Sequence, residues 1–227
     1  MSEIRQRFST RLSGDGIDIG PGHCPWPVPP TVRSVRLVDR WDPDANRTLF
    51  PELGADADFR EPDVISNLDV DRLSAFGDRS LDFVIASHVL EHLADPIGCL
   101  GEIRRVLRRG GVCLVMLPDR RYTFDRGRPG TPLAHLVAEH RAGVTEVDDE
   151  HVLEFIRNDR GQRWEPHPAE VAELCDIHRR RSVHAHCWTY EEFGEVIGYA
   201  SGRLGRWRIV DEGHSGDEFG FVLRRRL

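Results

Sequence analysis

The sequence predicts an α/β fold: a doubly wound, mainly parallel seven-stranded sheet, Rossmann-like, with an antiparallel C-terminal hairpin and a helical insertion. Five short apolar segments before residue 119 indicate strands, namely 16–20, 34–39, 62–66, 81–87 and 112–117. They are rich in Val, Ile and Leu without strict alternation, as parallel strands covered on both faces are. Two more segments, 206–212 and 218–225, are separated by a short turn and predict the closing hairpin.

Helix signals lie between these strands. Asp95 is a typical N-cap and Pro96 suits a first helical turn, so a helix should join the fourth and fifth strands. We expect Gly110–Gly111 to end it. Thr189 and Glu192 have the spacing of a capping box and predict a second helix before the hairpin.

Residues 119–187 are charged and arginine-rich, with weakly amphipathic segments at 132–140, 148–156 and 168–178. A structureless loop of this length is uncommon in a compact domain, so we expect a helical insertion. The predicted organisation is a cofactor-binding part of the sheet domain (1–118), an insertion that acts as an acceptor lid (119–187), and a helix and hairpin that complete the sheet domain (188–227).

The composition of the chain argues against several classes of protein. The formal net charge of −7 disfavours a dedicated surface for nucleic acid or anionic membranes. No apolar run approaches the roughly 20 residues of a transmembrane helix, and the first residues lack the apolar core of a signal peptide. Five irregularly spaced cysteines do not predict a disulfide framework. We therefore expect a cytoplasmic protein without a membrane or nucleic-acid partner; the oligomeric state stays open.

The stretch "GIDIGPGHCPWPVPP" (16–30) predicts a strand that enters a glycine turn. Gly20 and Gly22 allow the backbone to approach a ligand, and Asp39 ends the next strand, where an acidic residue binds ribose hydroxyls. A dinucleotide fingerprint would need glycine where Pro25 stands, followed by a helix whose N-terminus holds pyrophosphate. The prolines at 25, 27, 29 and 30 leave that helix short or missing. The pattern favours a cofactor with adenosine and no phosphate, S-adenosylmethionine.

Four segments, in order and at suitable spacing, resemble class I S-adenosylmethionine-dependent methyltransferases: "DIGPG" (18–22), "LVD" (37–39), "LDFVIASHVLEHLADP" (81–96) and "EIRRVLRRGG" (102–111). The resemblance covers residues 16–118 well and the final hairpin weakly. It implies a methyltransferase. The arginine and aromatic residues of the insertion suit a small-molecule acceptor such as a sugar, nucleotide-sugar or natural-product intermediate. The alternatives are a NAD-dependent oxidoreductase and a non-catalytic S-adenosylmethionine-binding module.

The resemblance also implies roles for single residues. Asp18 would orient the methionine ammonium group, directly or through water. Gly20 and Gly22 would face the methionine and ribose, and Asp39 the ribose diol. Asn67 and Leu68 would contact the adenine, with Asp69–Val70 as the alternative pair. Ser87 and His88 would end the fourth strand, beside the reactive methyl group.

Histidines are the candidate acid–base groups. His88 is the preferred base because imidazole titrates near neutral pH, and His186 is second. His88, Glu91 and His92 share one helical face and offer a divalent-metal site, with His184 or His186 as a fourth ligand. Some small-RNA and quinone O-methyltransferases carry a similar E-x-x-E-H site. Because His88 replaces its first glutamate, we expect no metal and assign Glu91 and His92 to packing.

The segment 175–187 gives only a weak signal for a structural zinc site. It would use Cys175, His178, His184, His186 and Cys187, whose spacing matches no standard zinc motif.

Overall fold

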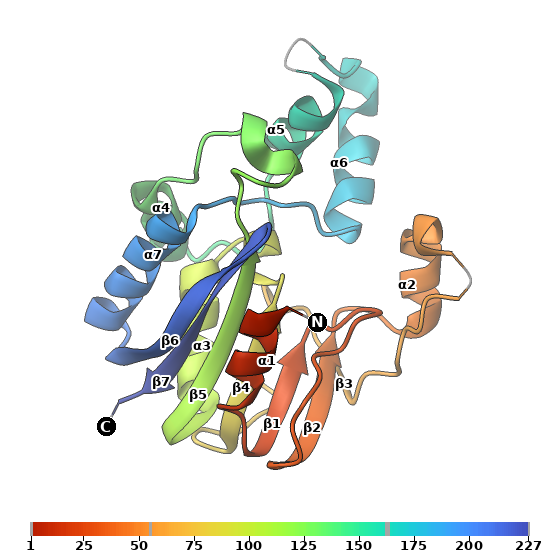
Figure 1. The fold of residues 1–227 in the computed structure, drawn as a ribbon. Coiled ribbons are helices and arrows are strands. Elements are labelled where there is room, and N and C mark those ends of the chain that lie inside the picture. The colour runs from red at the N-terminus through yellow and green to blue at the C-terminus, as the bar shows by residue number, and fades with distance from the viewer. Residues whose placement is uncertain (1, 55, 162–163, 227) are drawn as a thin grey trace.

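Seven strands form one sheet in the computed structural model, which describes residues 2–54, 56–161 and 164–226 (Figure 1). The strands are β1 Gly14–Ile19, β2 Val32–Asp39, β3 Val64–Ile65, β4 Leu81–Ser87, β5 Leu107–Pro118, β6 Trp207–Ser215 and β7 Glu218–Arg225. Their order in the sheet is β3-β2-β1-β4-β5-β7-β6. β7 runs antiparallel to β5 and β6, and the other neighbours are parallel. The predicted fold class, with its C-terminal hairpin, is confirmed.

The helices are α1 Glu3–Ser9, α2 Pro43–Leu49, α3 Pro96–Val106, α4 Leu133–Ala142, α5 Asp149–Arg160, α6 Val171–Arg180 and α7 Tyr190–Arg203. Short 3₁₀ turns occupy Pro51–Leu53, Leu90–His92, Phe124–Gly127 and Pro168–Glu170. The sequence analysis predicted α3 and α7 and the helical segments of the insertion, but not α1 or α2. No described helix is both long enough and apolar enough to cross a membrane.

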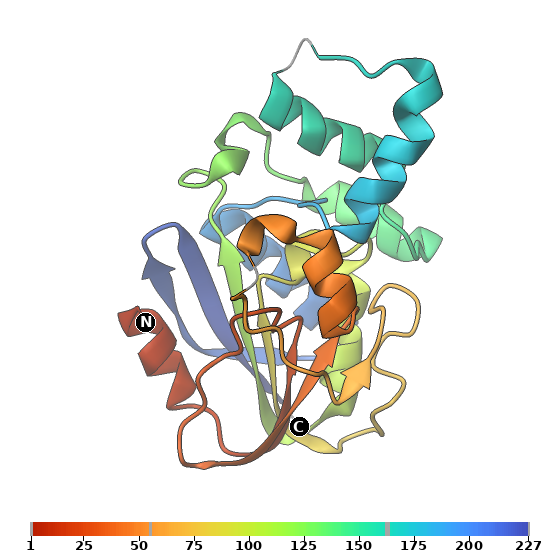
Figure 2. The same ribbon diagram turned by 90° about the vertical axis from the view of Figure 1, so that its right-hand side faces the viewer.

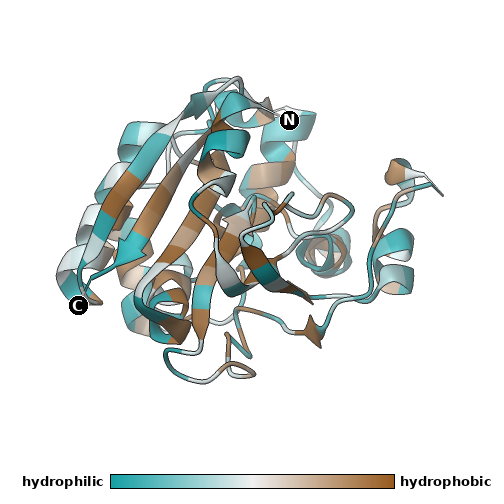
Figure 3. Ribbon diagram, turned by 60° about the horizontal axis from the view of Figure 1, so that its bottom comes forward, coloured by the Kyte–Doolittle hydropathy of each residue, from teal (hydrophilic) through white to brown (hydrophobic). Residues whose placement is uncertain are grey.

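The two faces of the sheet are covered differently (Figures 1 and 2). Successive side chains of a strand point to opposite faces. On β4, Val84 and Ala86 therefore enter the core under α3, α4 and α7, whereas Phe83 and Ile85 enter a second core under α1. Both sets are fully buried, so β4 is apolar along its central length. Figure 3 shows apolar residues on the strands in the middle of the sheet.

The segment after β1 contains no helix at residues 20–31, as the prolines predict. The N-terminal helix α1 covers this face instead. Ile4 and Phe8 of α1, together with Leu12 beyond it, are buried against Trp26 of the proline-rich segment. The indole Nε1 of Trp26 donates to Ser9 Oγ at 2.8 Å. Helix α1 and the proline-rich segment therefore form one cover.

The end of α3 differs from the prediction. Its start is confirmed, because Asp95 Oδ1 accepts a hydrogen bond from Gly98 N at 2.7 Å. Its end at Val106 comes four residues before the expected Gly110. Leu107 already pairs with Leu81 as the first residue of β5, and the glycines lie where the β4–β5 register shifts. Gly110 and Gly111 therefore belong to an irregular part of β5 and do not end α3.

The insertion holds three helices that pack in two ways. Helix α4 contacts α3 and α7, and its Leu136 belongs to the main core. Helices α5 and α6 share a separate small core that includes Val152, Ile156 and Cys175. They lie beyond the carboxyl ends of the parallel strands, at the top of Figure 1. After the insertion, Thr189 and Glu192 form both halves of the predicted capping box of α7.

The cover formed by α1 predicts a stability effect. Phe8→Ala should lower the free energy of unfolding by about 3–5 kcal/mol, because it empties a fully buried ring site. Phe124→Ala is the matched control, since the Phe124 side chain is 58% exposed. Urea titration followed by circular dichroism measures both. Equal, small losses for the two variants would show that α1 does not cover this face in solution.

Candidate functional site

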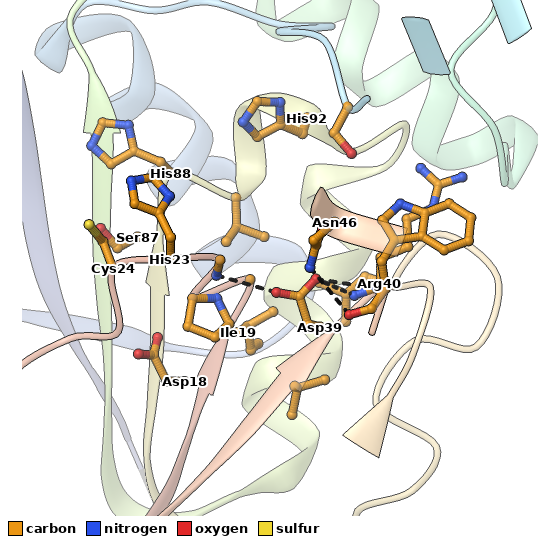
Figure 4. Close-up of a pocket in the computed structure, with 18 of the residues that line it drawn as sticks. Asp18, Ile19, His23, Cys24, Asp39, Arg40, Asn46, Ser87, His88 and His92 are labelled. Carbon is orange, nitrogen blue, oxygen red and sulfur yellow. Dashed lines mark hydrogen bonds between the residues drawn. The ribbon is translucent and has the colours of Figure 1, made fainter. Parts of the chain in front are cut away.

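A cavity of about 480 Å³ opens at the carboxyl ends of the parallel strands (Figure 4). β1, β2 and β4 end at Ile19, Asp39 and Ser87, and all three residues line it. The expected cofactor residues all line this cavity: Asp18, Gly20, Gly22, Asp39, Asn67, Leu68 and Ser87. So do His88, His92 and Asp69, whereas Glu91 and His186 are not among its lining residues.

The glycine turn has the backbone conformation that its sequence requires. Gly20 and Gly22 have φ values of 60° and 51°, in the left-handed region that other residues rarely adopt. A Cβ at Gly20 would lie 3.0 Å from a methyl group of Val89. Substitution at Gly20 would therefore strain the backbone and crowd the cavity wall.

Most backbone N–H groups of the same turn already donate hydrogen bonds within the chain. Gly20 N donates to Val38 O at 2.8 Å, and Gly22 N donates to Asp39 Oδ2 at 3.3 Å. Further along, the N–H groups of Cys24 and Trp26 also donate within the chain, and Pro21 and Pro25 have none. The turn lacks the row of free donors that a helix N-terminus would offer to a phosphate.

Asp18 lies at the base of the cavity and is 2% exposed. Its Oδ2 accepts a hydrogen bond from Trp26 N at 2.8 Å. Burial raises the pKa of Asp18 to about 7, and the nearby Asp39 charge adds to the rise, while the hydrogen bond from Trp26 and the charge of Arg5 oppose it. A cationic group beside this carboxyl would restore its charged form.

Two further carboxyl groups face the cavity. Asp39 Oδ1 accepts from the backbone N of Arg40 at 2.7 Å, and burial raises the pKa of Asp39 despite such backbone bonds. Asp69 Oδ1 accepts from Ala94 N at 2.9 Å, and burial raises the pKa of Asp69 to about 6. Three acidic groups in one cavity favour a ligand that carries positive charge.

Asn67 and Asp69 are joined by a local turn. Asp69 N donates to Asn67 Oδ1 at 3.1 Å, so the Asn67 amide nitrogen is the part of that side chain left for a ligand. Because both residues line the cavity, its geometry leaves the choice between them at the adenine open.

His88 ends up between two glutamates. Its Nε2 lies 3.1 Å from Glu218 Oε2 and its Nδ1 3.5 Å from Glu91 Oε1. Burial opposes its charged form, but the Glu218 hydrogen bond and both glutamate charges outweigh this, so the pKa of His88 is raised. Glu218 is also held by Arg5 Nη2 at 2.6 Å. Burial opposes its ionisation, but the Arg5 and His88 bonds lower the pKa of Glu218 to about 2.

Sequence reasoning missed this arrangement. Glu218 opens the last strand and Arg5 lies on the first helix, so only the finished sheet brings them to His88. His88 also has a left-handed φ of 56°, which no local sequence signal predicted.

The alternative metal trio of the sequence, His88, Glu91 and His92, is not a group whose ligand atoms converge. Ligand atoms of Glu91, His92 and His184 lie within 4.8 Å of one another, and His88 is not part of this group. His92 Nδ1 donates to Val183 O at 3.0 Å and His184 Nδ1 to Asp125 Oδ2 at 2.6 Å. Neither Nε2 atom has a hydrogen bond to another described residue. Glu91 is fully buried, and neither of its carboxylate oxygens has a hydrogen-bond partner among the described residues.

The residues of the weak zinc signal separate in space. Cys175 lies in the α5–α6 core, while Cys187 Sγ donates to Pro129 O at 3.3 Å. His186 is fully buried and stacks on Trp188.

The C-terminal end of α6 closes over the cavity mouth. Arg40 Nη1 donates to Arg179 O at 3.0 Å, and Trp41 Nε1 donates to Arg180 O at 3.2 Å. The last carbonyls of a helix have no intrahelical partner. The Trp41 bond satisfies the Arg180 carbonyl, and the Arg40 bond adds a second donor to the Arg179 carbonyl, which also accepts from Ser182 N at 3.1 Å. Arg181, just beyond α6, lines the cavity and forms an ion pair with Glu52 in the 3₁₀ turn Pro51–Leu53.

Part of this chain is similar to known methyltransferases. Residues 44–115 match the family described as a methyltransferase domain. A protein of Mycolicibacterium smegmatis, named as a probable S-adenosylmethionine-dependent methyltransferase, is 50% identical over 72 residues, which are 31% of this chain. The matched segment spans only 27% of that relative.

Solved structures share the fold at low identity. One similar structure is an S-adenosylmethionine-dependent methyltransferase from Thermotoga maritima, with a TM-score of 0.53 and 14% identity over 98% of this chain and 87% of that chain. Another is an S-adenosylmethionine-dependent methyltransferase from Methanosarcina mazei, with a TM-score of 0.51 and 14% identity over 97% of each chain. A chain from Rhodobacter sphaeroides with the provisional name Zn-dependent alcohol dehydrogenase is also similar, with a TM-score of 0.55 and 11% identity over 98% of this chain and 88% of that chain. At these identities the likeness concerns the fold alone. Residues 44–115 thus match a methyltransferase domain, and the whole chain shares its fold with S-adenosylmethionine-dependent methyltransferases.

Proposed function

We propose that this protein binds S-adenosylmethionine in the 480 Å³ cavity and transfers its methyl group to a small-molecule acceptor. The acidic wall of the cavity is the observation that carries the proposal. Asp18, Asp39 and Asp69 suit a ligand with a sulfonium and an ammonium group. The glycine turn, with its internal hydrogen bonds, suits a ligand without pyrophosphate and disfavours NAD.

The proposed roles follow the lining of the cavity. Asp18 holds the ammonium group, Gly20 and Gly22 give close backbone contact, and Asp39 accepts from the ribose hydroxyls. Asn67 or Asp69 meets the adenine amino group, with the apolar side chain of Leu68 beside the ring. Ser87, at the end of β4, borders the methionine.

His88 is the proposed acid–base group on the acceptor side. Once bound, the cofactor supplies an electrophilic methyl group, so the protein mainly positions the acceptor in line with it and removes a proton where needed. Glu218 and Glu91 hold the imidazole in place and stabilise its protonated form. His88 accepts a proton only in its neutral form, so turnover should increase as the pH rises through its raised pKa.

The cavity leaves little room for a large acceptor. Small-molecule sites commonly measure roughly 300–1,000 Å³, and this cavity, in the lower part of that range, must hold the cofactor as well as the reacting group of the acceptor. The lid contacts of α6 restrict its mouth, and the net charge of −7 disfavours a long polyanion.

Cofactor binding should depend on Asp39. Asp39→Ala should weaken binding of S-adenosylhomocysteine at least about tenfold, the scale of a lost charged hydrogen bond. Asp44→Ala is the control, because the Asp44 side chain is 97% exposed on α2. Isothermal titration calorimetry measures both variants, with NADH titrated in parallel. Binding of NADH but not of the homocysteine compound would refute the proposed cofactor.

The raised pKa of Asp18 predicts a pH dependence. The ligand ammonium needs the ionised carboxylate, and Asp18 loses its proton only as pH rises through about 7. Affinity for S-adenosylhomocysteine should therefore increase up to roughly tenfold between about pH 6 and about pH 7.5. In Asp18→Asn the affinity should be weaker and should rise much less over this range, to which Asp69, with its pKa of about 6, still contributes. An affinity that falls over the same interval in the wild-type chain would contradict the assigned role.

Methyl transfer can be sought with methyl-labelled S-adenosylmethionine and separate small-molecule, RNA and protein fractions of a bacterial extract. Label should enter the small-molecule fraction, and His88→Asn should lower the rate about 100-fold while leaving S-adenosylhomocysteine affinity within a few-fold. Label found only in RNA or protein would contradict the acceptor class. An unchanged rate in His88→Asn would assign the imidazole a structural role.

A further inference from the structure

We propose that His135, Glu139, His151 and His186 bind one divalent metal ion, with Zn²⁺ the ion that this ligand set favours. His135 and Glu139 lie one turn apart on α4, His151 lies in the first turn of α5, and His186 lies in the segment that leads to α7. Their ligand atoms are all within 4.8 Å of one another. None of the four lines the cofactor cavity.

The separations fit a tetrahedral ion. His135 Nε2 lies 3.0 Å from His151 Nε2 and 3.2 Å from Glu139 Oε1. His151 Nε2 is 3.4 Å from Glu139 Oε1, and His186 Nε2 is 3.7 Å from Glu139 Oε2. Metal–ligand bonds of about 2.0–2.2 Å place the ligands of tetrahedral Zn²⁺ about 3.3–3.6 Å apart. Small side-chain adjustments would bring all four to that spacing.

Buried polar atoms at the cluster lack partners. His186 is fully buried, and neither of its ring nitrogens has a hydrogen-bond partner among the described residues. The same holds for Glu139 Oε2, whose 3.7 Å separation from His186 Nε2 is too long for a hydrogen bond. Buried groups of this kind normally have a partner. A cation between these two atoms would satisfy both.

A second carboxylate orients one of the imidazoles. His151 Nδ1 donates to Asp148 Oδ1 at 2.7 Å, which fixes the tautomer and turns the Nε2 lone pair toward the cluster. Metal-binding histidines commonly have such a carboxylate partner on the other ring nitrogen. Asp148 also caps α5 by accepting from His151 N, so the start of α5 holds the ligand in place.

Four protein ligands would close the coordination shell, which is typical of a structural site. The ion would join three segments: α4, which packs on α3 and α7; the start of the lid helix α5; and the segment before α7. Three imidazoles and one carboxylate are ligands that Zn²⁺ readily accepts. The His135 side chain is 45% exposed and gives the ion a path from solvent.

The neighbouring group of Glu91, His92 and His184 is the competing location. It supplies three ligands, and His92 belongs to the cofactor cavity. The test must therefore tell the two groups apart.

The full chain, loaded with Zn²⁺ and dialysed against metal-free buffer, should retain about one Zn²⁺ by mass spectrometry. His135→Ala should lose the ion and, being exposed, should keep the circular dichroism of the wild-type chain. His186→Ala should also lose it. His178→Ala on α6 and His92→Ala should keep it. Co²⁺ should give the visible absorption of a tetrahedral site in the wild-type chain but not in His135→Ala.

Asp148→Ser offers a finer test. Serine still caps a helix but is too short to hold the His151 ring, so Zn²⁺ affinity should fall about 10–100-fold. Failure of the wild-type chain to retain Zn²⁺ would overturn the proposal. So would an ion that survives His135→Ala and is lost in His92→Ala.

Discussion

The hydrogen bond from the Trp26 N–H to the buried carboxyl of Asp18 is the contact on which the rest of the site depends. The proline-rich segment after β1 cannot form a helix, so it needs an anchor of another kind. Asp18 supplies this anchor from the carboxyl end of β1. Trp26 in turn is bonded to Ser9 and packs against α1, so the same contact fixes the cover of one sheet face and the shape of the glycine turn.

This anchor also shapes the electrostatics of the cavity. A buried carboxyl with a single strong donor keeps a raised pKa, and the neighbouring Asp39 raises it further. An ordinary crossover helix would present its N-terminus here and favour an anion. The proline-rich segment removes that positive end and leaves a cavity with acidic walls. The proposed preference for a cationic, phosphate-free cofactor thus rests on the backbone of residues 20–30.

Local patterns predicted much of the fold: the N-cap at Asp95, the capping box at Thr189 and the missing helix after β1 all depend on neighbours in sequence. The end of α3 was wrong because glycine pairs serve both helix ends and strand irregularities. Glu218 beside His88, and the cluster around His186, join segments far apart in the chain and carry no local signal. The predicted roles at the cavity remain predictions, although its lining contains the residues expected for the cofactor.

A crystal structure of the chain soaked with S-adenosylhomocysteine tests the central claim most directly. The account predicts the ligand in the cavity, with its ammonium group within hydrogen-bonding distance of Asp18 and its ribose hydroxyls on Asp39. The segment 20–30 should stay non-helical, with Trp26 N still on Asp18. A ligand bound elsewhere, or one whose ribose avoids Asp39 while its ammonium group avoids Asp18, would contradict it.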